Sequence, residues 1–272
     1  MTFQKLRICF WAAGFCLPAL VSAQSYSLRK DLDIPLVAGL LAMKYHSSSL
    51  LEETREVPLV LSGLHRQNVP GFDRWAIGFY SPRLSSLSST VAGAALALPV
   101  AVNLWDTYQG RQAWYGSLVD VLLLQEALML SSSLSSYAKS FPVHSTPLTY
   151  DPAVPESEKM VRQNASSFFS NHTASAFTAA VYSAYTFQLK HSDSPLVPWV
   201  WGGSMALATG VGSLRVLAGK HFPSDVLAGA AVGALCGYLV PRLHKGKSRN
   251  WDLGLAMPAG SDIPTPVLQF KF

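Results

Sequence analysis

The sequence predicts an all-α protein, a bundle of about six core helices that spans a membrane or lies against one. Hydrophobic residues make up 49% of the 272 residues and charged residues only 14%, whereas roughly 25% charged residues is typical of soluble domains. Long stretches carry no charge, and strand-like alternation is scarce before the C-terminal tail. Such a chain either buries much of itself or lies in a membrane.

The N-terminus has the features of a secretory signal peptide. Lys5 and Arg7 precede an apolar stretch over residues 8–20, and small residues at 21–23 offer a cleavage site. The apolar stretch is shorter than the roughly 20 residues that cross a bilayer as a helix. We therefore expect residues 1–23 to be a signal peptide of a protein exported from a bacterial cytoplasm.

Loss of the signal peptide changes the charge and the cysteine content. It removes two positive charges, so the net charge falls from +5 to +3, which is too small to favour nucleic acid as a partner. It also removes two of the three cysteines and leaves Cys236 alone. The mature chain then has no internal disulfide, and its stability depends on packing.

Within a domain at residues 24–250, uncharged stretches mark the expected helices. They lie between Arg83 and Asp106, Arg162 and Lys190, Asp193 and Arg215, and Asp225 and Arg242, with a further helix over Gln112–Lys139. In the last uncharged stretch glycine recurs at positions 229, 233 and 237. Small residues at this spacing let two helices approach closely.

Two connections and a tail complete the predicted organisation. Residues 46–72 are mixed in character, and we expect a largely solvated connection there. Residues 140–164 contain four prolines, which exclude a long helix. The tail at 251–272 ends in VLQFKF, whose alternation is strand-like.

Two relations to the membrane fit this pattern, an integral bundle of five or six spanning helices or a periplasmic bundle that touches a membrane. We favour the integral bundle. Trp199 and Trp201 fit an interfacial anchor or core aromatics. Asp120 and Glu126 within an apolar helix would suit a transporter's proton relay, but the other helices carry no matching charges.

The stretch RVLAGKHFPSD, residues 215–225, has the composition of a phosphoryl-transfer site. Pro223 favours the first turn of a helix, which places His221 at a helix N-terminus that attracts anions. Asp225 can accept a hydrogen bond from one imidazole nitrogen and leave the other free to attack. Arg215 can hold a pair of phosphate oxygens. A phosphohistidine intermediate at His221 follows from these roles.

A second stretch, FFSNHTASAF, supplies the missing acid. His172 can protonate the leaving alkoxide. Ser170 and the backbone at Asn171 can donate hydrogen bonds to phosphate oxygens, and Lys139 can add a positive charge. Taken singly, each residue has an ordinary structural explanation, such as a helix cap or a helix-end cation. The combination carries the functional interpretation.

These residues, in this order, resemble the type 2 phosphatidic acid phosphatase superfamily, which also contains bacterial class A acid phosphatases and vanadium haloperoxidases. Its signatures are Lys-x6-Arg-Pro, Pro-Ser-Gly-His and Ser-Arg-x5-His-x3-Asp. The resemblance implies the helical bundle of that superfamily. It further implies a nucleophile at His221 oriented by Asp225, a general acid at His172, and phosphate binding by Lys139, Arg215 and Ser170.

The chain departs from the signatures at several positions. Thr146 replaces the arginine of the first signature, and we expect its hydroxyl to bind phosphate through one neutral hydrogen bond in place of a charged fork. Phe169 and Asn171 replace the proline and the glycine of the second signature, and Leu214 replaces the serine of the third. A lost transition-state donor costs about 10²–10³-fold in rate. Arg162 or His144 would have to compensate for the arginine that Thr146 replaces.

We therefore expect a phosphatase with a periplasm-facing site, acting on a phosphate monoester or diphosphate of a lipid such as an isoprenyl diphosphate, phosphatidate or lipid A. The alternative is a catalytically weakened envelope protein that binds phospholipid or phosphate without turnover, and a haloperoxidase ranks third. We expect no cofactor. We also expect no metal, because the seven histidines are scattered without a nearby ligand cluster. The expected partners are a phosphorylated lipid and the membrane.

Overall fold

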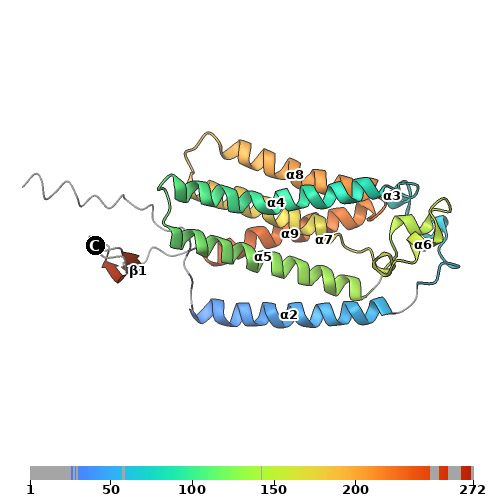
Figure 1. Ribbon diagram of the computed structural model, residues 1–272, viewed down its shortest axis with the longest axis horizontal. Coiled ribbons are helices and arrows are strands. Elements are labelled where there is room, and N and C mark those ends of the chain that lie inside the picture. Colours follow the sequence, from blue (N-terminus) through green and yellow to red (C-terminus); the bar gives the residue numbers. More distant parts are fainter. Residues whose placement is uncertain are drawn as a thin grey trace, which may run out of the picture.

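The computed structural model describes residues 26, 28, 30–56, 59–141, 143–245, 251–256 and 265–270. Within these residues six long helices form one elongated bundle (Figure 1), which confirms the predicted fold class. The helices are α2 (Lys30–Glu56), α4 (Pro82–Tyr108), α5 (Trp114–Ser140), α7 (Asn171–Lys190), α8 (Val197–Leu217) and α9 (Pro223–Leu243). The expected signal peptide at 1–23 lies outside the described residues.

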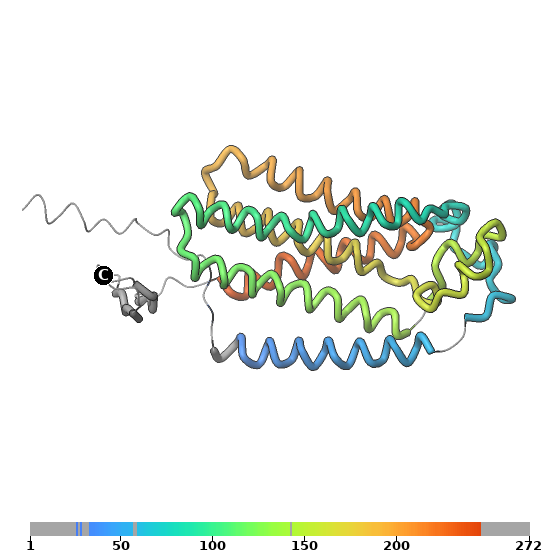
Figure 2. The backbone as a smooth tube through the Cα atoms, in the orientation of Figure 1, coloured from blue at the N-terminus to red at the C-terminus, as the bar shows by residue number. Residues whose placement is uncertain are grey.

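Helix α7 occupies the centre of the bundle and packs against α4, α5, α8 and α9, while α2 packs on the outside against α5. The connections from α2 to α4, from α5 to α7 and from α8 to α9 lie at one end, on the right of Figure 2. We call this the loop end. It contains the short helices α3 (Gly71–Arg74) and α6 (Glu156–Lys159).

The predicted solvated connection at residues 46–72 is wrong over its first part, because α2 continues to Glu56. Glu52 and Glu53 are exposed, and Glu52 pairs with Arg55 at 3.0 Å. A peripheral helix can carry such charges on its outer face, so charge did not mark a loop here. Residues 140–164 behave as predicted. Their described part has only short helical turns, among them η2 (Pro147–Tyr150).

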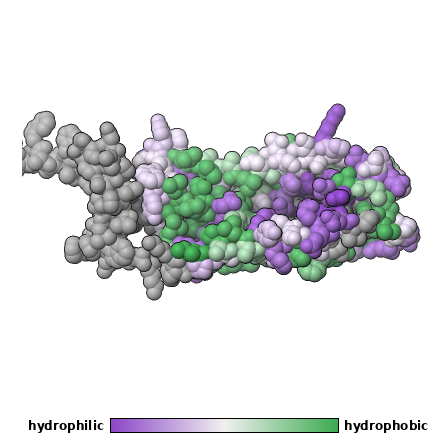
Figure 3. Space-filling view, turned by 60° about the horizontal axis from the view of Figure 1, so that its bottom comes forward, coloured by the Kyte–Doolittle hydropathy of each residue, from purple (hydrophilic) through white to green (hydrophobic). Residues whose placement is uncertain are grey.

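Among the described residues three helices, α4, α5 and α9, are long and apolar enough to cross a membrane. Figure 3 shows a broad hydrophobic region over one part of the bundle surface, with hydrophilic residues gathered toward the loop end. Trp199 is 77% exposed, which fits a membrane-facing anchor and excludes a core position for this side chain. These features support the membrane-spanning form of the bundle.

The glycines of α9 set its contact with α7. A Cβ atom added to Gly229 would lie 2.7 Å from the Ser170 carbonyl oxygen. At Gly233 it would lie 2.1 Å from the Ala174 carbonyl oxygen, and at Gly237 2.4 Å from that of Thr178. The two backbones therefore touch along three successive turns, as the glycine spacing predicts. This contact holds the N-termini of α7 and α9 side by side at the loop end.

The C-terminal tail contains a two-stranded antiparallel sheet of β1 (Trp251–Ala256) and β2 (Thr265–Phe270). Its outermost pair joins Trp251 to Phe270. Strand β2 includes most of the VLQFKF stretch, where the sequence predicts extended structure. The tail thus adds a hairpin to an otherwise helical chain.

Candidate active site

A tight turn between α8 and α9 positions the third signature. Gly219 adopts a φ of +70°, and a Cβ atom there would lie 2.0 Å from the Phe79 carbonyl oxygen. Only glycine fits both conditions without displacing the neighbouring chain. Helix α9 then begins with Pro223 in its first turn. His221 therefore lies just before a helix N-terminus, where the sequence predicts it.

Asp225 lies at the base of this arrangement and is fully buried. Its Oδ2 atom accepts hydrogen bonds from the Phe222 backbone N–H at 2.8 Å and from the Ser167 hydroxyl at 2.5 Å. The His221 Nδ1 atom is 3.6 Å from the same oxygen, which is too long for a hydrogen bond. The contact to His221 that the sequence suggests is therefore indirect.

Ser167 joins the two residues. Its Oγ atom lies 3.2 Å from His221 Nδ1. Because an ionised carboxylate only accepts, the Ser167 proton points to Asp225, and the Ser167 oxygen accepts from the Nδ1–H of His221. Nε2 of His221 then carries a lone pair. This Asp225–Ser167–His221 relay leaves Nε2 available as a nucleophile.

His144 contacts the other side of the same carboxylate. Its Nε2 atom is 3.3 Å from Asp225 Oδ1, and its ring packs edge-on to Phe222 with centroids 5.1 Å apart. Sequence reasoning missed the role of Ser167 and considered His144 only as a substitute cation. Ser167 directly precedes Phe168 and Phe169, and that proximity to the second signature is the one signal it offered.

Helix α4 brings two other predicted residues together. His172 Nε2 lies 3.4 Å from Ser89 Oγ, and Arg215 donates from Nη1 to Ser85 and Ser88, each at 3.3 Å. These serines lie in the first two turns of α4, and the sequence reasoning missed them although SSLSST stands out as a serine-rich start. His172 and Arg215 therefore face the same helix end.

Charge also links the predicted residues. Arg215 is 8% exposed, and its Nε–H has no hydrogen-bond partner among the described residues. The charges of Lys139 and Arg215 act electrostatically on both His172 and His221. A buried, incompletely satisfied guanidinium next to a second cation is costly without an anion. The arrangement suits phosphate.

The remaining predicted phosphate ligands differ in whether their side chains already have hydrogen-bond partners. Ser170 caps α7, and its Oγ atom accepts from the Thr173 N–H at 3.4 Å and from the Thr173 hydroxyl at 2.9 Å. The Asn171 Oδ1 and Thr146 Oγ1 atoms are buried and make no hydrogen bond within the described part of the chain. The backbone N–H of Thr146 donates to the Asn164 carbonyl at 2.9 Å. Arg162 is exposed.

Burial sets the protonation of the candidate nucleophile. It lowers the pKa of His221 to about 3, the charges of Lys139 and Arg215 lower it further, and Asp225 opposes the shift. The imidazole is therefore neutral at physiological pH. A neutral imidazole is the form that can attack phosphorus.

This pKa predicts a pH dependence of stability. The unfolded value is about 6.5, so the unfolded chain binds more protons between pH 6.5 and 3. The contribution of His221 is complete above pH 6.5 and is lost as the pH falls toward 3. Between pH 7 and 5 it amounts to about 2 kcal/mol. We expect the melting temperature of His221→Gln to fall less than that of the wild type over this range, measured in detergent. An equal fall of the melting temperature in the variant and the wild type would contradict the conclusion that the His221 imidazole is buried and neutral.

Comparison with known proteins matches part of the chain to one family. The sequence model of the PAP2 superfamily matches residues 120–249. This part of the chain is similar to the PAP2 superfamily. The match contains the Lys139, Ser170–His172 and Arg215–Asp225 segments, so the resemblance stated from the sequence is confirmed. Asp33 and the other residues before position 120 lie outside the matched range.

Individual PAP2 relatives match more narrowly. A lipid A 1-phosphatase from Porphyromonas gingivalis is 39% identical over 75 residues, which are 28% of this chain and only 16% of that relative. Among solved structures, the first transmembrane PAP2-type phosphatidylglycerolphosphate phosphatase from Bacillus subtilis is 20% identical, with a TM-score of 0.44. The match covers 77% of this chain and 94% of the phosphatase chain. LpxE from Aquifex aeolicus is 23% identical, with a TM-score of 0.42, and the match covers 62% of this chain and 92% of the LpxE chain.

Proposed function

We propose that this PAP2 protein hydrolyses a phosphate monoester or diphosphate of a lipid through a phosphohistidine at His221. The observation that carries the proposal is the Asp225–Ser167–His221 relay at the start of α9. It fixes one tautomer of a buried neutral imidazole next to two cations. A purely structural histidine would not need a buried, incompletely satisfied guanidinium close enough for its charge to act on the imidazole.

The reaction follows from these positions. His221 Nε2 attacks phosphorus and forms an N–P bond while the bond from phosphorus to the lipid oxygen breaks. Burial and the charges of Arg215 and Lys139 lower the pKa of His172 to about 4, so His172 needs the negative charge of the bound phosphate to hold the proton that it donates to the departing alkoxide. Water then attacks the phosphohistidine and gives its proton to His172, which is neutral after the first step; inorganic phosphate leaves, and the electron pair of the N–P bond returns to His221. Lys139, Arg215, Ser170 and the amides at the start of α7 hold the phosphate oxygens.

The membrane-spanning bundle favours a lipid as the carrier of the phosphate. Hydrophilic residues gather toward the loop end, next to the hydrophobic surface (Figure 3). A phosphate at that end would lie in the headgroup region while its chains lie along the helices. The lipid A 1-phosphatase relative makes lipid A one candidate. We place the loop end on the periplasmic side, in line with the expected signal peptide.

Phosphate release tests the proposed function. The purified full chain in detergent is given lipid A, phosphatidate, an isoprenyl diphosphate and a soluble monoester, each with a chelator present. We expect release from at least one lipid substrate and competition by vanadate, which mimics phosphate. Release from none of them, with vanadate still bound, would favour the non-catalytic alternative.

The presence of Thr146 where the first signature has an arginine favours the non-catalytic alternative, because the site then has one positive charge fewer. The Thr146 hydroxyl is buried and has no hydrogen-bond partner among the described residues. If the site works with one cation fewer, Thr146→Arg should raise kcat/KM by roughly tenfold, because a guanidinium gives a charged fork where a hydroxyl gives one neutral bond. Thr146→Val keeps the shape and serves as the control. A fall with Thr146→Arg together with an inactive Arg162→Ala would show that Arg162 already completes the site.

Ser167 is expected to act as a positioning residue. Ser167→Ala removes the acceptor that fixes the His221 tautomer, so we expect kcat to fall about 10–100-fold with little change in KM. The neighbouring Ser166→Ala, whose hydroxyl bonds the Lys139 carbonyl at 2.7 Å, should change kcat much less. A pH profile of kcat that stays the same in Ser167→Ala would argue against the relay.

A further inference from the structure

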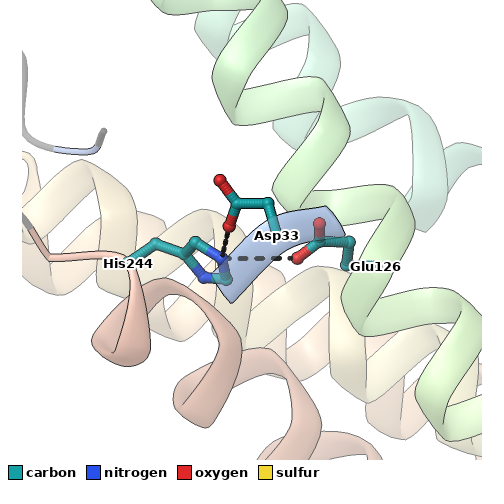
Figure 4. A group of neighbouring side chains, drawn as sticks. All are labelled: Asp33, Glu126 and His244. Carbon is teal, nitrogen blue, oxygen red and sulfur yellow. Dashed lines mark hydrogen bonds and ion pairs between the residues drawn. The ribbon is translucent and has the colours of Figure 1, made fainter. Parts of the chain in front are cut away.

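A cluster of three buried side chains lies away from the phosphate site, at the other end of α9 (Figure 4). It consists of Asp33 in the first turns of α2, Glu126 in α5 and His244, which follows the last residue of α9. The three are 9%, 5% and 1% exposed, respectively. Their ligand atoms all lie within 4.8 Å of one another. The sequence analysis expected no such cluster, because the three residues are far apart along the chain.

The tautomer of His244 follows from its contacts. Its Nδ1 atom is 2.8 Å from the Val240 carbonyl oxygen. A carbonyl only accepts, so Nδ1 carries a proton. Nε2 shares a second proton with Asp33 Oδ1 at 2.7 Å, and a metal ion that displaces this proton would bind the Nε2 lone pair. Metal-ligating histidines are oriented in this way, with the second ring nitrogen donating to a backbone carbonyl.

Two carboxylate oxygens face this one nitrogen. Asp33 Oδ1 lies 2.7 Å from His244 Nε2, and Glu126 Oε2 lies 3.7 Å from it. The proton on Nε2 is donated to the nearer oxygen, Asp33 Oδ1, so the oxygen of Glu126 receives no hydrogen bond from His244. Glu126 Oε2 is buried and has no hydrogen-bond partner within the described residues. A buried carboxylate oxygen left in this way is costly.

We propose that Asp33, Glu126 and His244 bind a divalent transition-metal ion of the Zn²⁺ type. One imidazole nitrogen with carboxylate oxygens is a ligand set that zinc accepts, with metal–ligand distances of about 2.0–2.2 Å. Ligand atoms around such an ion lie roughly 3.3–3.6 Å apart. The distances in the cluster bracket this value, so small side-chain movements complete the site.

The position of the cluster gives the ion a structural role. Asp33 belongs to α2, which packs on the outside of the bundle against α5. The ion would join the start of α2 to the middle of α5 and the end of α9, and so fasten the outer helix to the core. Because the cluster and His221 lie at opposite ends of α9, we expect metal binding to take no direct part in the phosphate chemistry.

Metal titration tests the proposal. The full chain in detergent is stripped with a chelator and titrated with Zn²⁺, with Mg²⁺ as the comparison ion. Bound metal is measured by mass spectrometry and unfolding by the melting temperature. We expect one Zn²⁺ per chain and a rise of roughly 5–10 °C when free zinc is about 100 times its Kd. Mg²⁺, which requires six oxygen ligands, should have little effect.

Two isosteric variants identify the ligands. Glu126→Gln should weaken zinc binding about 100-fold or more, yet raise the melting temperature of the metal-free protein, because it removes an unsatisfied buried charge. Asp120→Asn is the matched control. Asp120 is a buried carboxylate of the same helix that already accepts from Gln112 at 2.7 Å, so this variant should be destabilised equally with and without zinc. His244→Gln should abolish binding.

The opposite results would overturn the proposal. Less than about 0.1 Zn²⁺ per chain, or the same zinc-induced rise in wild type and Glu126→Gln, would mean that the cluster shares protons and holds no metal.

Discussion

Replacing His221 with alanine should abolish phosphate release. The imidazole is the one group proposed to bond to phosphorus, so we expect kcat/KM to fall about 10⁴-fold or more. Phosphate binding should be largely kept, because Lys139 and Arg215 supply the charge. Turnover on the best lipid substrate and vanadate binding by the purified variant measure the two effects separately.

His191→Ala is the control for this experiment. Its imidazole also contacts a carboxylate, with Nε2 2.7 Å from Asp106 Oδ2, but it lies at the far end of α7 from His172. We expect its turnover to stay near that of the wild type. Equal turnover in wild type and His221→Ala would show that another nucleophile, or a contaminating enzyme, releases the phosphate.

Replacing Gly233 with alanine should cause the largest loss of stability. The new Cβ atom would meet the Ala174 carbonyl oxygen at 2.1 Å, and neither backbone can move without separating α7 from α9. Overpacking of this kind costs about 1–3 kcal/mol, and a backbone clash falls at the upper limit. Since 1 kcal/mol corresponds to about 2–4 °C in a chain of this size, we expect a drop of roughly 6–12 °C in detergent.

Gly203→Ala provides the matched comparison. Gly203 lies inside α8, is exposed, and a Cβ atom there meets nothing within 4 Å. Alanine should therefore be neutral or stabilising by up to about 1 kcal/mol, because glycine disfavours helix interiors. A similar loss in both variants would mean that helix propensity, and not the α7–α9 contact, explains the effect.

Four of the six long helices could be predicted from uncharged stretches, and α5 from a helix-like stretch that carries Asp120 and Glu126. Helix α2 could not, since Glu52, Glu53 and Arg55 gave residues 46–56 the appearance of a loop. The glycine spacing in α9 predicted a close contact with another helix but did not identify α7 as the partner. A sequence pattern shows which face of a helix packs, and only the arrangement of the whole bundle decides what it packs against.

The same division holds for the candidate site. His221, Asp225, His172 and Arg215 could be chosen from spacing, because helix starts and their polar residues are encoded locally. Ser167 and the α4 serines could not, because their contacts cross 54 to 130 positions of the chain.

The sequence by itself therefore determined the helical class and the choice of the His221 segment as the candidate site, both of which depend on composition and short-range spacing. The tertiary structure alone decided that a serine stands between His221 and Asp225, and that Asp33, Glu126 and His244 meet. Both contacts join residues that are far apart along the chain. The close packing of α7 on α9 and the position of α2 against α5 bring them together, and no local sequence pattern encodes this arrangement.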